Sequence, residues 1–183
     1  RQDVSRWLVA WIVGVEWDGD ATLRTDRTRA GAPGHQGRYF RSTPEATPTE
    51  RWLAKHMDAL ATLEAKRGVS APIAFVNWPT TDPLSHPTEP LDREDLVGID
   101  ANHVLPTKAW PGGTFASFHA YPYYPDFQRY EPGLDETEWK GKPDRYAGYL
   151  TSLRDHFAGT MPLLITEFGV PSSLGNAHNG PRG

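Results

Sequence analysis

Four short apolar segments constrain the fold of this 183-residue chain more than any other feature. They are rich in β-branched and aromatic residues and cover residues 8–15, 72–78, 114–121 and 162–168. Short apolar runs of this kind are typical of strands that are buried on both faces of a parallel sheet. We therefore predict four parallel strands separated by long connections.

Two helices are predicted between these strands. Thr47 can cap the first helix and Glu50 completes a Thr-x-x-Glu capping box, while Gly68 can end it. The second helix should begin near Asp144 and end before Gly159. Their apolar sides should contain Trp52, Leu53, Met57, Leu60 and Leu63 in the first helix, and Tyr146, Tyr149, Leu150, Leu153 and Phe157 in the second. Alternating strands and helices indicate an α/β fold with a parallel sheet, either open or closed.

The connections after the first two strands are long and rich in Pro, Gly, Thr and Asp. They cover residues 18–46 and 79–91, and loops of this length in a compact domain are usually functional. The charged run 24–29 is expected to be a solvated loop, although arginines beside a sugar-binding cleft could also recognise an acidic sugar. Residues 92–97 are predicted as a short helix, and residues 98–105 as an irregular or extended excursion without an assigned partner.

Composition and charge exclude several classes of function. The chain has no cysteine, so disulfides and thiolate metal sites are excluded. Its net charge is −4, with arginines and acids interspersed, and this leaves no electrostatic footprint for nucleic acid or an anionic lipid surface. No apolar run approaches the roughly 20 residues that span a bilayer. We expect neither a nucleic-acid partner nor membrane contact from this segment.

Each predicted strand delivers polar or aromatic residues at its carboxyl end, where α/β proteins carry their sites. These residues are Glu16, Trp17, Asn77, Trp78, His119, Tyr121 and Glu167. Aromatic faces stack on sugar rings, amides and imidazoles bind hydroxyls, and a carboxylate pair can perform acid/base and nucleophilic chemistry. The set predicts a carbohydrate substrate. Trp17 and Trp78 are equally compatible with packing roles.

Two segments resemble the clan A glycoside hydrolases. Residues 165–169 (Ile-Thr-Glu-Phe-Gly) are similar to the strand-seven nucleophile motif of that clan, and residues 118–122 (Phe-His-Ala-Tyr-Pro) are similar to strand six of its family 5 members. The resemblance covers strands four to seven of a (β/α)8 TIM barrel, which is nearly the whole chain. It implies that residues 1–183 form a single partial catalytic domain without strands one to three and strand eight.

A complete barrel typically needs roughly 250 residues, and the chain opens on Arg1 without a methionine. We therefore interpret it as part of a longer protein. More narrowly, it resembles actinobacterial proteins described as membrane-associated glycosyl hydrolases or transferases. That likeness implies an extracytoplasmic or membrane-associated parent.

The resemblance implies a retaining glycosidase that acts on O-glycosidic bonds by double displacement. Glu167 would be the nucleophile, and Glu16, at the end of strand four, would be the acid/base. Tyr121 would donate a hydrogen bond to Glu167, and His119 would shape the wall of the same pocket. No cofactor is implied.

The chain departs from the clan pattern at one position. The clan has Asn directly before the acid/base Glu, where it binds the 2-hydroxyl of the sugar, whereas this chain has Val15. Asn77 on the next strand is a candidate for that contact. A second class of function stays open, a barrel that binds glycans without catalysis or that transglycosylates. A catalytic metal is not expected, because no ligand spacing links the candidate residues His86, His103, His119, His178, Asp82 and Asp100.

Overall fold

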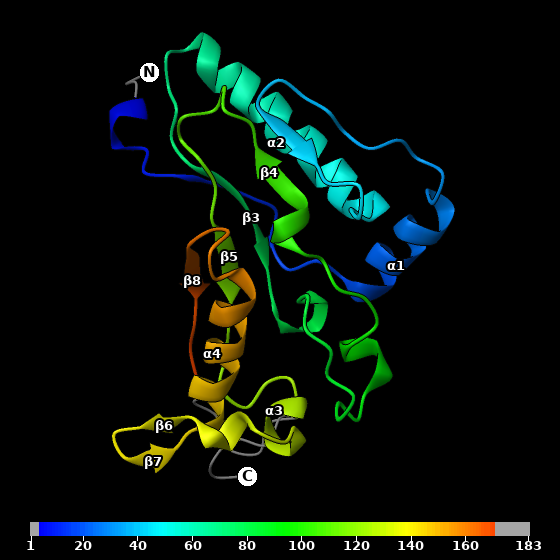
Figure 1. Cartoon of the computed structure of the whole chain (residues 1–183), viewed down its shortest axis with the longest axis vertical. Helices are drawn as coiled ribbons and strands as arrows, with labels where there is room; N and C mark the ends of the chain where they lie inside the picture. Colours follow the sequence, from blue (N-terminus) through cyan, green and yellow to red (C-terminus); the bar gives the residue numbers. More distant parts are fainter. Residues whose placement is uncertain (1–3, 171–183) are drawn as a thin grey trace.

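The computed structural model of the chain describes residues 4–170, which form a mixed α/β fold around a four-stranded parallel sheet (Figure 1). The strands of this sheet are β1 (Trp11–Val13), β3 (Ile73–Asn77), β5 (Ala116–His119) and β8 (Leu163–Glu167). They lie side by side in that order, and every neighbouring pair is parallel. The prediction of four parallel strands from the four apolar segments is confirmed.

The first strand is shorter than predicted. It ends at Val13 because Gly14 adopts a left-handed conformation with φ +86°, which side chains disfavour. The indole ring of Trp17 packs so closely against Gly14 that a Cβ atom there would clash with it. The chain therefore bends immediately before Glu16.

The two predicted helices are present as α2 (Pro48–Lys66) and α4 (Arg145–Phe157). The capping box of α2 is formed, because Thr47 Oγ1 accepts from the backbone N–H of Glu50 at 3.2 Å and Glu50 Oε2 accepts from that of Thr47 at 2.6 Å. Asp144 caps α4 by accepting from the backbone N–H of Ala147 at 2.9 Å. Both helix starts are confirmed.

The buried face of α2 differs from the predicted one. Trp52 and Leu63, which were placed on the apolar side of this helix, are 44% and 58% exposed and do not belong to its buried face. Alanines occupy part of the buried stripe instead, which is formed by Leu53, Ala54, Met57 and Ala61. A pattern that counts only large apolar residues misses this, because small residues are what let a helix approach its sheet closely.

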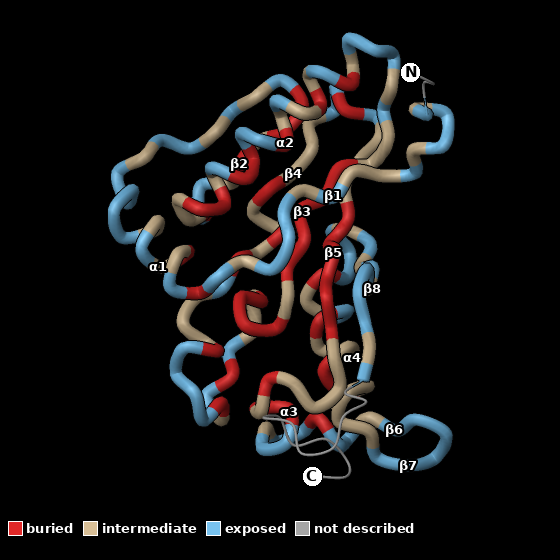
Figure 2. Tube along the Cα trace, turned by 180° about the vertical axis from the view of Figure 1, so that it is seen from behind, coloured by how far each residue is buried: buried red, intermediate tan, exposed pale blue. Residues whose placement is uncertain are grey.

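One face of the sheet packs against the helices, and the opposite face is buried on the inner strands but partly exposed on the outer strands. Side chains that pack with the helices in the core alternate along the strands: Trp11, Val13, Ile73, Phe75, Ala116, Phe118, Leu163 and Ile165. On the opposite face, Ala74, Val76 and Ser117 of the inner strands are buried, but Ile12 of β1 is 42% exposed and Leu164 of β8 is 44% exposed. Figure 2 shows this contrast between the buried inner strands and the exposed β8.

Three elements were missed in the connections. Residues 18–46 are not a continuous loop, because they contain α1 (Gly19–Thr28) and β2 (Phe40–Ser42). The excursion 98–105 contains the start of β4 (Val104–Pro106), which pairs antiparallel with β2. Helix α1 is almost entirely polar, and β2 and β4 have three residues each, so neither offers a hydrophobic period.

The remaining elements are short. They are η1 (Ser5–Trp7), η2 (Pro79–Thr81), η3 (Asp92–Glu94), η4 (Ala101–His103), α3 (Phe127–Tyr130), η5 (Leu134–Glu136), β6 (Glu138–Trp139) and β7 (Lys142–Pro143). Only residues 92–94 of the predicted helix 92–97 are helical, as a single 3-10 turn. Within residues 4–170, none of the helices is both long and apolar enough to cross a membrane.

Candidate active site

The candidate site lies at the carboxyl end of the sheet. Glu16 follows β1 beyond the Gly14 bend, His119 is the last residue of β5, and Glu167 is the last residue of β8. His119 and Glu167 are register partners in the β5–β8 pair, beyond an irregularity that follows Phe118. Parallel strands end at the same edge, so this pairing brings the imidazole and the carboxylate together.

The two carboxylates meet around one imidazole. His119 Nδ1 lies 3.0 Å from Glu16 Oε1 and 3.7 Å from Glu167 Oε2. One oxygen of each carboxylate and the histidine nitrogen all lie within 4.8 Å of one another. His119 is 9% exposed, whereas the Glu16 and Glu167 side chains are 32% and 55% exposed. A buried imidazole thus contacts two carboxylates that are accessible to solvent.

Tyr121 completes the group. Its hydroxyl donates a hydrogen bond to Glu167 Oε1. Burial raises the pKa of Tyr121, and the hydrogen bond and negative charge of Glu167 raise it further. The phenol therefore stays protonated and remains a donor at neutral pH.

The backbone around Tyr121 is fixed by a side chain that the sequence did not single out. Gln128 is buried, and its Nε2 donates to the carbonyl oxygens of Tyr121 at 2.9 Å and Tyr124 at 2.7 Å. A buried amide that bonds two main-chain carbonyls fixes the turn between them. Gln128 lies on α3, nine residues beyond β5, so no strand-end rule could have identified it.

Asn77, which was predicted to bind substrate, makes its hydrogen bonds within the protein instead. Asn77 is 1% exposed, and its amide bonds the carbonyls of Thr81 and Ile99 and accepts from Trp78 N and Thr81 Oγ1. Its hydrogen-bonding capacity is filled, so the expected contact with the 2-hydroxyl is corrected to a structural role.

Trp17 is also held by contacts within the protein. Its Nε1 donates to the carbonyl of Val76 at 2.7 Å, and its ring packs edge-on against Trp52 of α2 with centroids 5.9 Å apart. Sugar stacking and packing were both left open for this indole, and the structure shows Trp17 in the packing role, as an anchor of the loop after β1.

Trp78 is fixed by contacts within the protein and lines a separate hollow. Its Nε1 donates to the carbonyl of Trp17 at 2.8 Å, and its ring lies 6.0 Å from that of Tyr124 with 34° between the planes. Trp78 and Tyr124 line a hollow of about 280 Å³, hereafter the side hollow, together with Asp18, Gly19, Asp20, Thr80, Arg93 and Glu94.

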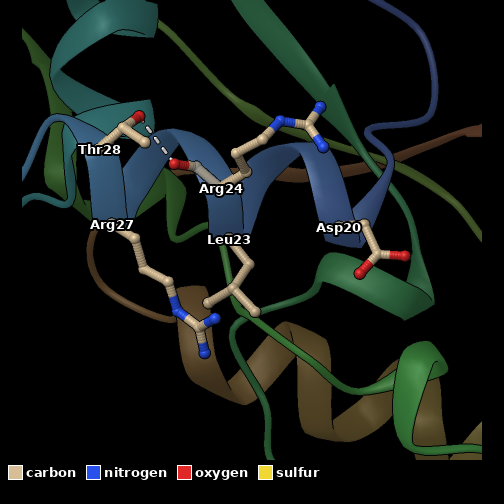
Figure 3. Close-up of a pocket in the computed structure, with 5 residues that line it drawn as sticks. All are labelled: Asp20, Leu23, Arg24, Arg27 and Thr28. Carbon is tan, nitrogen blue, oxygen red and sulfur yellow. Dashed lines mark hydrogen bonds between the residues drawn. The ribbon is translucent and has the colours of Figure 1, made fainter.

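Arg24 and Arg27 of the charged run 24–29 lie on α1 and not in a solvated loop, and Arg29 is the C-cap residue of this helix. Arg24 and Arg27 line a shallow hollow of about 460 Å³ on the exposed side of this helix, with Asp20, Leu23 and Thr28. Figure 3 shows their guanidinium groups pointing apart. Divergent guanidinium groups do not form a clamp for one carboxylate, so nothing in this arrangement favours recognition of an acidic sugar by these two arginines.

Three of the candidate histidines have carboxylate partners. His86 lies between Asp82 and Glu131, His103 Nδ1 lies 2.8 Å from Glu50 Oε2, and His119 Nδ1 lies 3.0 Å from Glu16 Oε1. His178 lies outside the described residues. Among residues 4–170, Glu16, His119 and Glu167 are the group that offers three ligand atoms close enough for a metal ion.

A buried polar network that joins Asp82 and His86 of the loop 79–91 to Glu131 and Tyr149 was not foreseen. His86 Nδ1 lies 2.7 Å from Glu131 Oε2, its Nε2 lies 3.2 Å from both oxygens of Asp82, and Tyr149 donates to Asp82 Oδ2 at 2.6 Å. The imidazole stacks on Phe127 with centroids 3.5 Å apart. Burial lowers the pKa of His86, but hydrogen bonds and charges of the two carboxylates outweigh it and raise the pKa to about 9.

No family model, curated protein or solved structure matches this chain.

Proposed function

We propose that the protein is a retaining O-glycoside hydrolase with Glu167 as nucleophile and Glu16 as acid/base. The observation that carries this proposal is the convergence of Glu16, His119 and Glu167 within 4.8 Å, with Tyr121 donating to Glu167. Retaining glycosidases need two carboxyl groups about 5–5.5 Å apart, one of them ionised to attack the sugar. The resemblance of residues 165–169 to a clan A nucleophile motif supports the same assignment.

The chemistry proceeds in two displacements. Glu167 attacks the anomeric carbon while Glu16 gives its proton to the departing glycosidic oxygen, which forms a covalent glycosyl-enzyme and frees the leaving group. Glu16, now ionised, then takes a proton from water as the water oxygen attacks the same carbon. Glu167 leaves, and the configuration is retained. His119, beside both carboxylates, would position them.

The finer architecture that we propose is a partial (β/α)8 barrel. In a flat sheet, β1 and β8 would be separated by three strand spacings, roughly 14 Å. The acids that follow or end these outer strands nevertheless meet around His119 of an inner strand. Curling of the sheet toward a barrel, with the bend at Gly14, accounts for this convergence.

A mechanism-based inhibitor tests the function. Incubation of the full-length gene product with 2-deoxy-2-fluoroglycosides bearing a dinitrophenolate leaving group should add one sugar mass, and peptide mapping should locate it on Glu167. Glu167→Gln should abolish labelling. Glu16→Gln should still label with this good leaving group, but it should hydrolyse glycosides of poor leaving groups about 10²-fold more slowly or worse.

A non-catalytic glycan-binding or transglycosylating protein is the second candidate. It is favoured by Val15 in the position of the clan asparagine and by the internal bonding of Asn77, which leave the usual 2-hydroxyl contact unassigned. Saturable sugar binding without any labelling of Glu167 would favour a binding protein. Labelling followed by release onto sugar acceptors and not onto water would favour a transglycosidase.

A further inference from the structure

The side hollow has the form of a binding site for one small unit. Its volume of about 280 Å³ is near the lower end of small-molecule pockets, roughly 300–1,000 Å³. It is formed by three separate segments: the residues after β1 with the start of α1, the residues after β3 with η3, and the turn after β5. All three segments follow carboxyl ends of strands, as the carboxylate pair does.

One wall of the side hollow is aromatic and fixed. The Trp78 indole is anchored by its hydrogen bond to the carbonyl of Trp17, and the Tyr124 hydroxyl donates to Glu94 Oε2 at 2.7 Å. Aromatic rings that are already fixed lose little entropy on binding, and their faces suit the apolar side of a sugar ring. The wall is thus ready to stack a pyranose.

Glu16 does not line the side hollow, but it is close in sequence to a residue that does and acts electrostatically on another. Asp18, which lines it, is two residues beyond Glu16 in the chain, and the negative charge of Glu16 is among the causes that raise the pKa of Tyr124, after burial and Glu94. In the proposed mechanism, Glu16 protonates the leaving oxygen. A unit bound beside Glu16 is therefore the leaving-group sugar.

The charge of the side hollow is predominantly negative. Asp18, Asp20 and Glu94 face a single cation, Arg93, whose side chain is 77% exposed and lies 3.8 Å from Glu94. Asp18 uses one oxygen to cap α1 by accepting from Ala21 N at 2.7 Å. Carboxylate oxygens accept hydrogen bonds from hydroxyl and ammonium groups and repel other carboxylates.

We propose that the side hollow is the subsite for the leaving-group sugar, and that its acidic lining selects neutral or amino sugars over uronic acids. This inference rests on the proposed function for the reaction, but binding to the hollow can be measured without catalysis. Asp20, which has no hydrogen-bond or ion-pair partner within residues 4–170, is the residue through which selectivity is tested.

The experiment uses the fluoroglycosyl-enzyme of the full-length gene product. Its reactivation is timed with glucose, glucosamine or glucuronic acid as acceptor, because an acceptor must occupy the leaving-group subsite. Glucose and glucosamine should accelerate reactivation, and glucuronic acid should not. Asp20→Asn should reduce the acceleration by glucosamine about tenfold, the usual loss for one charged hydrogen bond. Glu138→Gln, on the distant β6–β7 hairpin, is the matched control and should behave as the wild type.

Calorimetric titration of the unlabelled protein with methyl glucosaminide and methyl glucuronide separates the two proposals. Labelling of Glu167 without any preference among acceptors overturns the subsite and leaves the hydrolase intact. Absence of labelling, with glucosaminide binding that Asp20→Asn weakens, overturns the hydrolase and supports the side hollow as a binding site for neutral or amino sugars. Equal binding of both glycosides, or none of either, overturns the subsite whatever the labelling shows.

Discussion

At the scale of single residues, the site depends on one neutral donor beside two acids. Tyr121 remains protonated because burial and Glu167 both raise its pKa. In the proposed mechanism, this protonated phenol donates its hydrogen bond to the carboxylate that attacks the sugar, Glu167. Gln128 fixes the Tyr121 backbone through its hydrogen bond to the Tyr121 carbonyl.

Tyr121→Phe should therefore impair turnover more than binding. The substitution keeps the ring and removes the hydroxyl that donates to Glu167. We expect kcat on aryl glycosides to fall roughly tenfold or more, with a smaller change in KM, because a hydrogen bond to a charged group contributes about 1.5–3 kcal/mol. Steady-state kinetics measures both constants. A raised KM with unchanged kcat would contradict the assignment.

The buried His86 should make stability depend on pH. Its folded pKa of about 9 lies above the ordinary value of 6.5, so the protonated imidazole between Asp82 and Glu131 stabilises the fold fully below about pH 6.5. This contribution is lost as the pH rises through 9. Two further residues contact the group. Tyr149 donates a hydrogen bond to Asp82, and Asp95 accepts one from the backbone N–H of His86.

Urea unfolding at pH 6.5 and pH 9.5 measures the effect. The free energy of unfolding should fall by on the order of 2 kcal/mol between these values in the wild type. His86→Gln should be less stable at pH 6.5 and should show a much smaller fall. His56→Gln is the control, since His56 is exposed on α2 and should leave the pH dependence unchanged. A pH-independent wild type would refute the ion-pair description.

The strand-end rule identified the residues that meet at the site but not their orientations. Glu16, His119 and Glu167 follow or end apolar runs, and the sheet brings them together. The rule failed for Asn77 and Trp17 because it cannot tell which side chains face the cleft. An amide at the end of a strand can bind a ligand or can bond nearby loops, and Asn77 donates to carbonyls in two such segments.

At the scale of elements, the start of α2 shows what local sequence determines. Glu50 belongs to the capping box, but it also accepts from Asp100 N at 2.6 Å and lies 2.8 Å from His103 Nδ1. Burial raises the pKa of Glu50, and the hydrogen bonds from Asp100 and Thr47 oppose that effect. The local motif was predictable, whereas its connection to a segment 50 residues away was not.

Substitutions at this helix start should destabilise the fold more when they remove more hydrogen bonds. Thr47→Ala removes one cap and should cost about 1 kcal/mol of unfolding free energy. Glu50→Ala leaves two backbone donors and the His103 ring without their acceptor and should cost about 3 kcal/mol. Thr62→Ala in the same helix removes only a bond to the Asp58 carbonyl and should be nearly neutral. Urea denaturation of the three variants checks the order, and a Thr47→Ala loss equal to that of Glu50→Ala would contradict it.

Elements with strong apolar patterns were predictable, and polar ones were not. The four strands and two long helices bury large side chains, which leave a period in the sequence. Helix α1 is stabilised instead by its Asp18 cap and by packing against α2 and η3, so its sequence reads as a polar loop. The pairing of β2 with β4 joins segments about 60 residues apart, and no local signal specifies it.

At the scale of the whole molecule, the sheet has two open sides within residues 4–170. Strands β1 and β8 are the outer strands, and each is paired on one side only. Ile12 and Leu164 on these strands expose apolar side chains on the face away from the helices. Unpaired parallel edges with exposed apolar groups favour association with other strands.

The 183-residue chain expressed alone should therefore self-associate. Its mass of 20.4 kDa sets the monomer value, and light scattering at micromolar concentrations should give a larger mass that grows with concentration. Ile12→Lys and Leu164→Lys should together lower that mass, because charge on an exposed edge opposes pairing. Val9→Lys is the control, since Val9 is 85% exposed but precedes β1 and should leave association unchanged.

A longer protein that supplies strands to both edges should be monodisperse. Pairing would bury the exposed apolar faces, and this burial stabilises by about 25 cal/mol per Å² of apolar area. A stable monomer of the chain that also labels at Glu167 would mean that four strands suffice, and the eight-stranded barrel would then have to be abandoned.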